Sequence, residues 1–360
     1  MSGEKVLMAM SGGVDSSVAA ALLLEAGYEP IGVTMRLWTP PQGAGPHQGC
    51  CSLDDVNDAR RVADQLGIPH YTVNMKEEFR HNVVDYFVAE YLAGRTPNPC
   101  IACNRVLKFD LLLQKAHQLG AQKIATGHYA RIAHYGGGWQ LRRGSDANKD
   151  QSYFLFDIPT DKFPHILFPV GELTKDEVRA TAQRRGLKTA QKAESQEICF
   201  VPDDDYAAFI RSLNPDIPSG DFVDRTGKRL GEHRGIPFYT VGQRRRLGIS
   251  AGERLYVTAI EPETNTVVLG PEEELLAETM ELDKVTLHQQ VTDGQEVGVQ
   301  VRYRQTPAKA TIRLHDENRA TIEFAAPQRA VAPGQAAVFF DGDTVLGGGW
   351  IRTFTSHQRN

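Results

Sequence analysis

Short apolar runs alternate with segments of helical periodicity up to residue 128 of the chain. The apolar runs predict buried strands, and segments with apolar residues three or four positions apart predict helices. Because strands and helices alternate, the pattern indicates βαβ units and a doubly wound parallel sheet of the α/β class. We expect strands at 5–10, 30–35, 70–74 and 123–128, and helices at 16–26, 54–66, 77–92 and 109–119.

The composition and the hydrophobic pattern of the chain change past residue 205. A capping box, Thr174 with Glu177, predicts one more helix that ends before Gly186. Residues 218–250 are then rich in Gly, Pro and Arg, and from about residue 280 the apolar pattern has a period of two. Such short strands between turn signals predict a small antiparallel β-barrel. We therefore expect three domains, at residues 1–204, 205–275 and 276–360.

Composition narrows the class of protein. The 360 residues are 41% apolar and 24% charged, which suits globular domains with real cores. No apolar run has the length of a membrane span, and no signal peptide is apparent, so we expect a cytoplasmic protein without membrane contact. The formal net charge is −5, so binding to a nucleic acid would depend on local basic patches. The candidate patch for phosphate contact contains Arg225, Lys228, Arg229, Arg234, Arg244, Arg245 and Arg246, and the alternative is a solvated arginine face.

The glycine-rich segment SGGVDSS (11–17) joins the first predicted strand to the first predicted helix. Backbone N–H groups and the helix dipole at such a turn favour an anionic phosphate. The segment lacks the lysine that the P-loop of nucleoside triphosphatases requires. Met35 and Gly127-His128 also fall at predicted strand ends, which indicates a single nucleotide site at one edge of the sheet. The alternative is a glycine turn in which Asp15 and Ser16 only cap the helix.

Five cysteines all lie in the first 200 residues. An odd number in a large cytoplasmic chain argues against a disulfide framework and for catalytic, redox or metal chemistry. The pair Cys100 and Cys103 alone fits a redox pair, half of a zinc site or iron–sulfur ligands. Burial of a single cysteine as an apolar residue is the plainer reading. It is weaker for Cys100, Cys103 and Cys199 together, because we expect the first two in a turn between two helices and the third in another loop, and both loops are polar.

Nine motifs follow one another along the chain: SGGVDSS (11–17), GCCSLDD (49–55), TPNPCIACN (96–104), TGHYA (126–130), KDQSYFL (149–155), SQEICF (195–200), GQRRRLGI (242–249), RYRQTP (302–307) and PGQAAVFF (333–340). With these motifs in this order, the chain resembles the tRNA-specific 2-thiouridylases (MnmA/TrmU) over almost its whole length. The resemblance implies the PP-loop ATP pyrophosphatase fold, which is Rossmann-like, ahead of the central domain and the barrel. It also implies 2-thiolation of the wobble uridine, position 34, in tRNAs for Lys, Glu and Gln.

In that family ATP, with Mg²⁺, adenylates the 2-oxygen of the base, and sulfur then replaces the oxygen. Cys199 matches the cysteine that carries a persulfide, received from a sulfur-relay protein or a cysteine desulfurase. Cys103 matches its partner, which would release the sulfur and leave a Cys103–Cys199 disulfide. The free enzyme is expected to be a monomer.

The resemblance also implies binding residues. Those expected to hold ATP are Ala9, Met10, Ser11, Gly12, Gly13, Val14, Asp15, Ser16, Met35 and Gly127. Those expected to contact the target base or the rest of the tRNA are Asn98, Pro99, Cys100, His128, Lys149, Asp150, Gln151, Arg302, Tyr303, Arg304, Gln305 and Gln335.

One position departs from part of the family, which has an acidic residue where this chain has Cys100. Three thiolates, from Cys100, Cys103 and Cys199, could then hold a [4Fe–4S] cluster instead of passing a persulfide. Two rival functions stay open beside these. One is another PP-loop ATP-dependent tRNA-modifying ligase, which needs no cysteine, and the other is a non-catalytic RNA-binding or sulfur-carrier protein.

Overall fold

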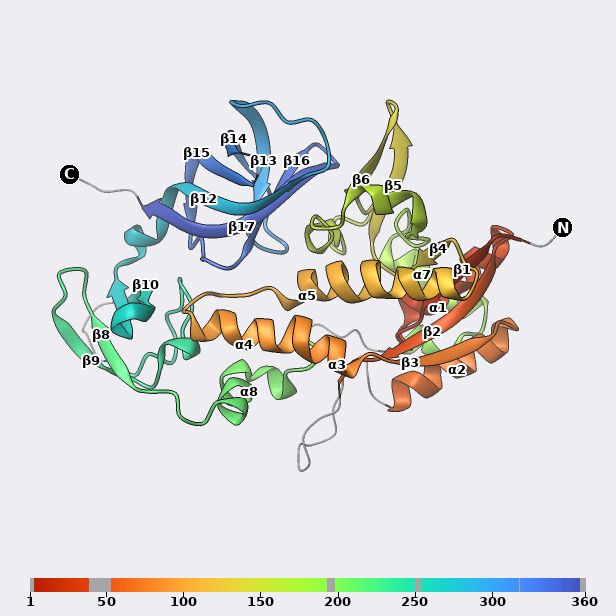
Figure 1. Cartoon of the computed structure of the whole chain (residues 1–360), viewed down its shortest axis with the longest axis horizontal. Coiled ribbons are helices and arrows are strands. Elements are labelled where there is room, and N and C mark those ends of the chain that lie inside the picture. The colour runs from red at the N-terminus through yellow and green to blue at the C-terminus, as the bar shows by residue number, and fades with distance from the viewer. Residues whose placement is uncertain (1–2, 39–52, 193–197, 250–253, 317, 357–360) are drawn as a thin grey trace. The chain divides into compact units, whose positions relative to one another are not determined.

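A computed structural model of the protein describes residues 3–38, 53–192, 198–249, 254–316 and 318–356. The chain divides into two compact units (Figure 1). The first contains Met1–Val84, Cys100–Asp204 and Asp343–Val345, and the second contains Asp85–Pro99, Asp205–Gly342 and Leu346–Asn360. Cys50 and Cys51, for which the sequence indicates no role, lie outside the described residues, as does the first part of the SQEICF motif.

A parallel sheet forms the centre of the first unit, as predicted. Its strand order is β3-β2-β1-β4-β7, and every described neighbouring pair is parallel. The chain order reverses between β1 and β4, and ligands of open α/β sheets bind beyond the carboxyl ends of the strands at such a point. The strands span Lys5–Ala9 (β1), Glu29–Arg36 (β2), His70–Asn74 (β3), Lys123–Ala125 (β4) and Ile166–Leu167 (β7).

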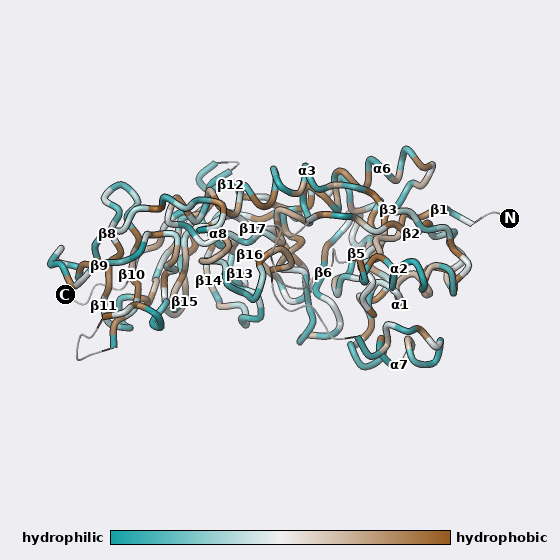
Figure 2. The backbone as a smooth tube through the Cα atoms, turned by 90° about the horizontal axis from the view of Figure 1, so that it is seen from below, coloured by the Kyte–Doolittle hydropathy of each residue, from teal (hydrophilic) through white to brown (hydrophobic). Residues whose placement is uncertain are grey.

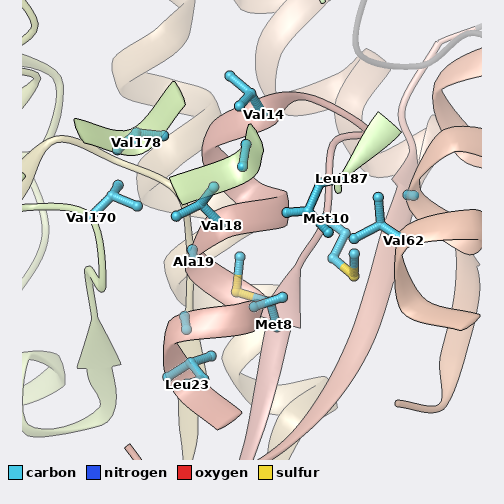
Figure 3. Packing of buried hydrophobic residues seen from close by; sticks show 14 of the residues in the cluster. Met8, Met10, Val14, Val18, Ala19, Leu23, Val62, Val170, Val178 and Leu187 are labelled. Carbon is cyan, nitrogen blue, oxygen red and sulfur yellow. The ribbon is translucent and has the colours of Figure 1, made fainter. Parts of the chain in front are cut away.

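Helices of this unit pack on the sheet through small and branched apolar side chains. Figure 3 shows Val14 and Val18 of the first helix among Met8, Met10 and residues of other elements, all of them buried. The helices span Val14–Glu25 (α1), Leu53–Leu66 (α2), Lys76–Phe79 (α3), Pro99–Ala102 (α5), Leu112–Gln118 (α6) and Lys175–Arg184 (α7), and a hairpin is formed by Ala130–Tyr135 (β5) and Gly138–Arg143 (β6).

The capping box predicted for α7 is confirmed. The Thr174 hydroxyl accepts from the Glu177 N–H (3.3 Å), and the Glu177 carboxylate accepts from the Thr174 N–H (2.7 Å). The carboxylate accepts from the Thr174 hydroxyl as well (2.9 Å), and its bonds from the Thr174 N–H and hydroxyl lower the pKa of Glu177. The helix therefore begins with its donors satisfied, and Lys175 is fixed as its first residue.

The prediction for the cysteine pair was wrong in its local structure. We expected Cys100 and Cys103 in a turn ahead of a helix at 109–119, but the chain is helical from Pro99 to Gln118. Proline suits the first helical position, and no glycine or second proline interrupts the sequence before Gly120. The middle of this helix, Cys103–Leu111, is π-helical, a conformation that often occurs at functional sites.

The second unit begins with a helix from early in the sequence. Phe87 and Tyr91 of α4 (Asp85–Leu92) pack against residues of α8 (Tyr206–Leu213): the Phe87–Phe209 ring centroids are 6.4 Å apart, and Tyr91 stacks on Tyr206 at 4.8 Å. A four-stranded sheet of order β10-β11-β8-β9 follows. Its strands span Gly220–Val223 (β8), Arg229–His233 (β9), Tyr256–Glu261 (β10) and Thr266–Gly270 (β11).

The predicted barrel is confirmed in the same unit. Six strands have the order β12-β15-β14-β13-β16-β17, and antiparallel pairing of β12 with β17 closes the ring. Closure leaves no unpaired strand edge. Hydrophobic and hydrophilic residues both occur along the barrel strands (Figure 2); they alternate in Ala308–Asp316, whereas residues 336–340 are all buried, and the inward side chains form a buried core. The strands span Leu276–Leu287 (β12), Gln295–Gln300 (β13), Ala308–Asp316 (β14), Arg319–Arg329 (β15), Ala336–Asp341 (β16) and Thr344–Ser356 (β17). No helix in the described parts is long and apolar enough to cross a membrane.

Candidate functional site

The predicted phosphate loop turns directly from β1 into α1, and its own side chains hold its shape. The Ser11 N–H donates to the Ser16 hydroxyl (3.2 Å), and the Ser16 and Ser17 hydroxyls donate to the Gly13 carbonyl (3.1 and 2.8 Å). Gly13 is the N-cap of α1 and has no side chain to cover the first helical N–H groups. Those donors and the positive end of the helix dipole suit an anionic group above the loop.

Gly12 has a structural reason to be glycine. Its φ is +73°, and a Cβ there would lie 2.3 Å from the Asp55 carbonyl oxygen. The first turn of α2 therefore lies directly behind the phosphate loop. The Lys192 ammonium joins the two, because it donates to the Gly12 carbonyl (3.1 Å), to Asp55 (2.8 Å) and to Asp58 (2.7 Å). Burial alone would lower the pKa of Lys192, but hydrogen bonds to the two carboxylates outweigh it and raise that pKa.

The segment after β4 lies against the start of α1, as the strand-end argument predicts. A Cβ on Gly127 would lie 2.7 Å from the Ser16 nitrogen, so only glycine allows this approach. Next to it, the Tyr129 hydroxyl donates to the Asp15 carboxylate (2.7 Å), and Gln151 accepts from the Tyr129 N–H (3.0 Å). Met35, the third predicted contact, lies at the end of β2 in register with Val73 of β3.

Two lysines that the sequence does not single out lie at the loop. Lys175 is only 7% exposed, and its ammonium bridges both oxygens of Asp15 (2.7 and 2.9 Å). With Lys192 it brings positive charge to a phosphate loop that has no lysine of its own. The two residues follow Asp15 by more than 150 positions. The only local signal for Lys175 is the capping box that begins α7.

His128 lies inside the protein. Its ring is 9% exposed and contacts Thr126 through Nδ1 (2.6 Å) and Lys108 through Nε2 (3.4 Å). Lysine can only donate, so Nε2 must accept and Nδ1 carries the proton that it donates to the Thr126 hydroxyl. Burial lowers the pKa of His128 well below its ordinary value, and the Lys108 charge adds to this. The ring is therefore neutral at pH 7, and contact with a tRNA would require the surrounding side chains to move.

The predicted tRNA contacts at 149–151 differ in exposure. Lys149 and Gln151 are half-buried, whereas Asp150 is 8% exposed. The Asp150 carboxylate accepts from the Gly144 and Ser152 N–H groups (both 3.0 Å), from the Ser152 hydroxyl (3.0 Å) and from Arg143 (2.8 Å). This carboxylate organises the turn from inside, and its neighbours form the surface.

All three candidate cysteines belong to the first unit. Cys100 is exposed, Cys199 is half-buried and Cys103 is 9% exposed. The residue after Cys199, Phe200, packs edge-on against Phe79 of α3 at 5.5 Å between centroids. Helix α3 also contacts the π-helical segment that begins at Cys103. The elements that carry Cys103 and Cys199 thus share α3 as a neighbour.

The cysteines do not form a visible cluster site. Among the residues that the structure describes, no three His, Cys, Asp or Glu side chains come together as a group that could hold a metal ion. The arrangement of Cys100, Cys103 and Cys199 therefore adds no support to the iron–sulfur alternative.

The remaining predicted contacts belong to the second unit. Asn98 is half-buried, Pro99 is buried, and the backbone carbonyls just before them accept from the side chain of Gln335. In the segment 302–305, Arg302 and Arg304 are exposed and Tyr303 is half-buried. Arg302 donates to the Ala330 carbonyl, Arg304 lies 5.3 Å over the Tyr303 ring, and Gln305 donates to Gln328 (3.2 Å).

Ion pairs neutralise part of the positive charge of the predicted basic patch. Arg229 pairs with Asp221 (2.7 Å) and Arg225 with Glu274 (3.6 Å). The run Arg244–Arg246 is exposed. Phe238 and Tyr239, which the sequence places among these arginines, are buried and belong to the core of this unit.

A parallel sheet with a lysine-free phosphate loop at its topological reversal, and cysteines in the same unit, defines a PP-loop nucleotide-binding protein with candidate sulfur chemistry. Family comparison identifies the chain further. A family described as tRNA methyl transferase HUP domain matches residues 4–203, a PRC-barrel domain of the same description matches 207–271, and an aminomethyltransferase β-barrel domain matches 277–351.

Curated relatives match over nearly the whole length. The tRNA-specific 2-thiouridylase MnmA of Heliobacterium modesticaldum is 52% identical, over 97% of this chain and 92% of its own. The MnmA proteins of Geobacter metallireducens (50% identical, 97% and 96% covered) and Pelotomaculum thermopropionicum (49%, 98% and 98%) are similar to the same extent. The chain belongs to the MnmA family of tRNA-specific 2-thiouridylases.

Proposed function

We propose that this protein is the tRNA-uridine 2-sulfurtransferase that its family membership indicates. It acts on the wobble uridine, position 34, of tRNAs for Lys, Glu and Gln. The matching domain descriptions mention methyl transfer, whereas the full-length relatives are named 2-thiouridylases. A phosphate loop and cysteines suit activation by ATP followed by sulfur transfer, and they have no obvious use in methyl transfer.

One observation carries the proposal. The phosphate loop, Cys103 and Cys199 belong to one compact unit, and both cysteine-bearing elements pack on α3. An ATP-dependent ligase without sulfur chemistry would need the loop alone, and a sulfur carrier would need a cysteine alone. We also propose three domains, at residues 1–204, 205–275 and 276–360. Each of the three family matches falls within one of these ranges, which supports the proposed boundaries.

ATP supplies the activating group. The loop residues Ala9–Ser16 hold its phosphates, with Met35 and Gly127 at the nucleoside, and Mg²⁺ accompanies the phosphates. A urea-like carbonyl oxygen is a poor leaving group. We propose that the uridine 2-oxygen attacks the α-phosphorus, so that pyrophosphate leaves and an adenylated base forms. The ammonium groups of Lys175 and Lys192 lie beside the loop, bonded to Asp15 and to Asp55 and Asp58, and we propose that they also donate to the phosphates of ATP, which favours departure of the anionic pyrophosphate.

Sulfur then replaces the activated oxygen. A cysteine desulfurase or a sulfur-relay protein loads Cys199 with a persulfide. The Cys103 thiolate attacks the Cys199 sulfur, which forms a Cys103–Cys199 disulfide and releases the outer sulfur as hydrosulfide. That sulfur attacks C2 of the base, and AMP leaves. Cys100 adjoins the base, and the half-buried position of Cys199 is compatible with delivery from a partner protein.

Residues of each unit are proposed to contact the tRNA. Asn98–Cys100 contact the extruded base, and bases of an anticodon loop are already splayed, so extrusion costs little. Further tRNA contacts are proposed for His128, Lys149, Asp150, Gln151, Arg302, Tyr303, Arg304 and Gln305. The enzyme is proposed to act as a cytoplasmic monomer when free.

The test is thiolation of unmodified tRNA with ATP and a persulfide donor, using protein purified without oxygen and assayed for iron and sulfide. We expect iron-free protein to form 2-thiouridine, and Cys199→Ser to form none. Full product formation by Cys199→Ser would favour a ligase that needs no cysteine. Activity that requires iron would favour the cluster, and absence of ATP turnover would favour a carrier. Transcripts of other tRNAs in parallel test the choice of tRNA.

A further inference from the structure

Asn98 lies in a segment of four residues, Thr96–Pro99. Two of them are prolines, which have fixed φ angles and no N–H. Thr96 and Asn98 each precede a proline, which restricts both to extended conformations. The segment is stiff. The rest of the fold can form backbone hydrogen bonds to it only through its carbonyl groups and the N–H groups of Thr96 and Asn98.

The turn between β15 and β16 of the barrel forms hydrogen bonds to backbone groups of this segment. The side-chain amide of Gln335 donates to the Thr96 carbonyl (2.9 Å) and to the Pro97 carbonyl (3.3 Å). The Thr96 N–H in turn donates to the Pro333 carbonyl (2.8 Å). Between them, Gly334 has a φ of +88°, and a Cβ there would lie 2.9 Å from the Thr96 nitrogen. The turn therefore lies directly against the segment.

This turn is itself fixed to the barrel. The Gly334 N–H donates to the Ile351 carbonyl (2.9 Å), and the Ile351 N–H donates to the Gln335 carbonyl (2.8 Å). Strand β17, which contains Ile351, is one of the two strands that close the barrel. A second, weaker tie comes from the central part of the unit, where the Thr96 hydroxyl donates to Thr240 (3.4 Å).

We propose that Gln335 is a positioning residue: through the carbonyls of Thr96 and Pro97 it sets where Asn98 meets the target base, so it controls the rate of the reaction and not the affinity for tRNA. The inference rests on the proposed function, because it takes the segment to contact the base. It replaces the direct tRNA contact that the family resemblance suggests for Gln335, because the amide donors of that side chain are already used.

The two roles predict opposite kinetics. A residue that only contacts tRNA should raise the Kd for tRNA and leave the rate at saturation unchanged. A positioning residue should lower the rate at saturation and leave the Kd unchanged. Gln335→Glu keeps the shape but removes both donors and turns an anion toward two carbonyl oxygens. Loss of two hydrogen bonds to the segment should lower the single-turnover rate roughly ten- to hundred-fold.

The experiment measures the single-turnover rate of 2-thiouridine formation at saturating enzyme, ATP and persulfide donor, and separately the Kd of unmodified tRNA by filter binding. Gln335→Met, which lacks the donors without adding charge, should also be slow. Gln335→Lys, which can donate to the same carbonyls, should recover part of the rate. Gln295→Glu is the matched control, because Gln295 holds another barrel turn by accepting from the Thr292 N–H (3.0 Å), which a carboxylate also does.

A raised Kd with an unchanged saturating rate in Gln335→Glu would overturn the proposal, as would equal rates for Gln335→Met and the control. If Gln335→Glu does not fold, Thr240→Val decides the matter, since it removes the weaker tie and should lower the same rate by a smaller factor at an unchanged Kd. Failure of the unaltered protein to thiolate tRNA would refute the proposed function, and is thereby distinguished from failure of this inference.

Discussion

Two neighbouring glycines in the phosphate loop should lose stability to very different degrees when each is replaced by alanine. Gly12 has a left-handed φ of +73°, and its added Cβ would meet the Asp55 carbonyl oxygen at 2.3 Å. Gly13 has a φ of −89°, and the nearest atom to its Cβ is the Ser11 hydroxyl at 3.4 Å. Alanine is therefore strained and crowded by backbone at the first position, and accommodated at the second.

The size of the effect follows from two contributions. An L-residue in the left-handed region costs about 1–2 kcal/mol. Real Cβ atoms essentially never approach within 3.0 Å, so the first turn of α2 would also have to move, and overpacking of this kind costs roughly 1–3 kcal/mol. We expect Gly12→Ala to lower the free energy of unfolding of the first unit by about 2–5 kcal/mol, or its Tm by roughly 4–20 °C. Gly13→Ala should change it by about 1 kcal/mol or less, because alanine is only a poorer N-cap there.

The assay is thermal unfolding of the ligand-free protein, because an alanine could also collide with bound phosphate and confuse a binding measurement. The chain has three tryptophans, of which Trp38 and Trp139 belong to the first unit and Trp350 to the second. In a Trp350→Phe background, fluorescence reports the first unit alone. Equal stability of Gly12→Ala and Gly13→Ala would refute the packing of α2 behind the loop.

Three further outcomes test the site. Lys175→Met should lower the rate of ATP–pyrophosphate exchange in the presence of tRNA by roughly 10- to 100-fold, since one charged contact beside the loop is lost, whereas an unchanged rate would exclude a role for this lysine in activation. For His128, whose pKa is lowered by burial, the folded protein binds fewer protons than the unfolded chain below pH 6.5, so stability is complete above that pH and falls below it. The unfolding free energy of the unaltered protein relative to His128→Gln should therefore decrease from pH 7 to pH 5, by at most about 1.4 kcal/mol per pH unit, and a constant difference would contradict a buried neutral ring. In Cys103→Ser, labelled sulfur from the donor should accumulate on Cys199 without 2-thiouridine formation, whereas normal product yield would show that no second thiol is needed.

Much of the fold was predictable from patterns within short stretches of the sequence. The parallel sheet, the turn from β1 into α1, the capping box of α7 and the barrel each depend on residues close together in the sequence, and periodicity or turn chemistry reports them. The approach of Gly127 to Ser16 was predictable, because strand ends of a parallel sheet share one edge.

Contacts between distant residues were not predictable in the same way. Nothing local to Lys192 indicates that its ammonium would reach Gly12, 180 positions earlier. The π-helical turns around Cys103 also escaped prediction, because their side chains read as ordinary helix or loop. Gln335 is the clearest case: the sequence identified the residue through resemblance, but only the fold reveals that its partners are the Thr96 and Pro97 carbonyls.

The interleaving of the two units has a consequence for biosynthesis. Helix α4 is made early, but the rings that cover Phe87 and Tyr91 belong to α8, whose residues Tyr206 and Phe209 leave the ribosome more than a hundred residues later. At ordinary translation speeds the wait is roughly 6–24 s. During that time two aromatic side chains stand uncovered on the nascent chain, within reach of chaperones. A fragment that ends at Asp204 would keep them uncovered permanently, so we expect such a fragment to aggregate.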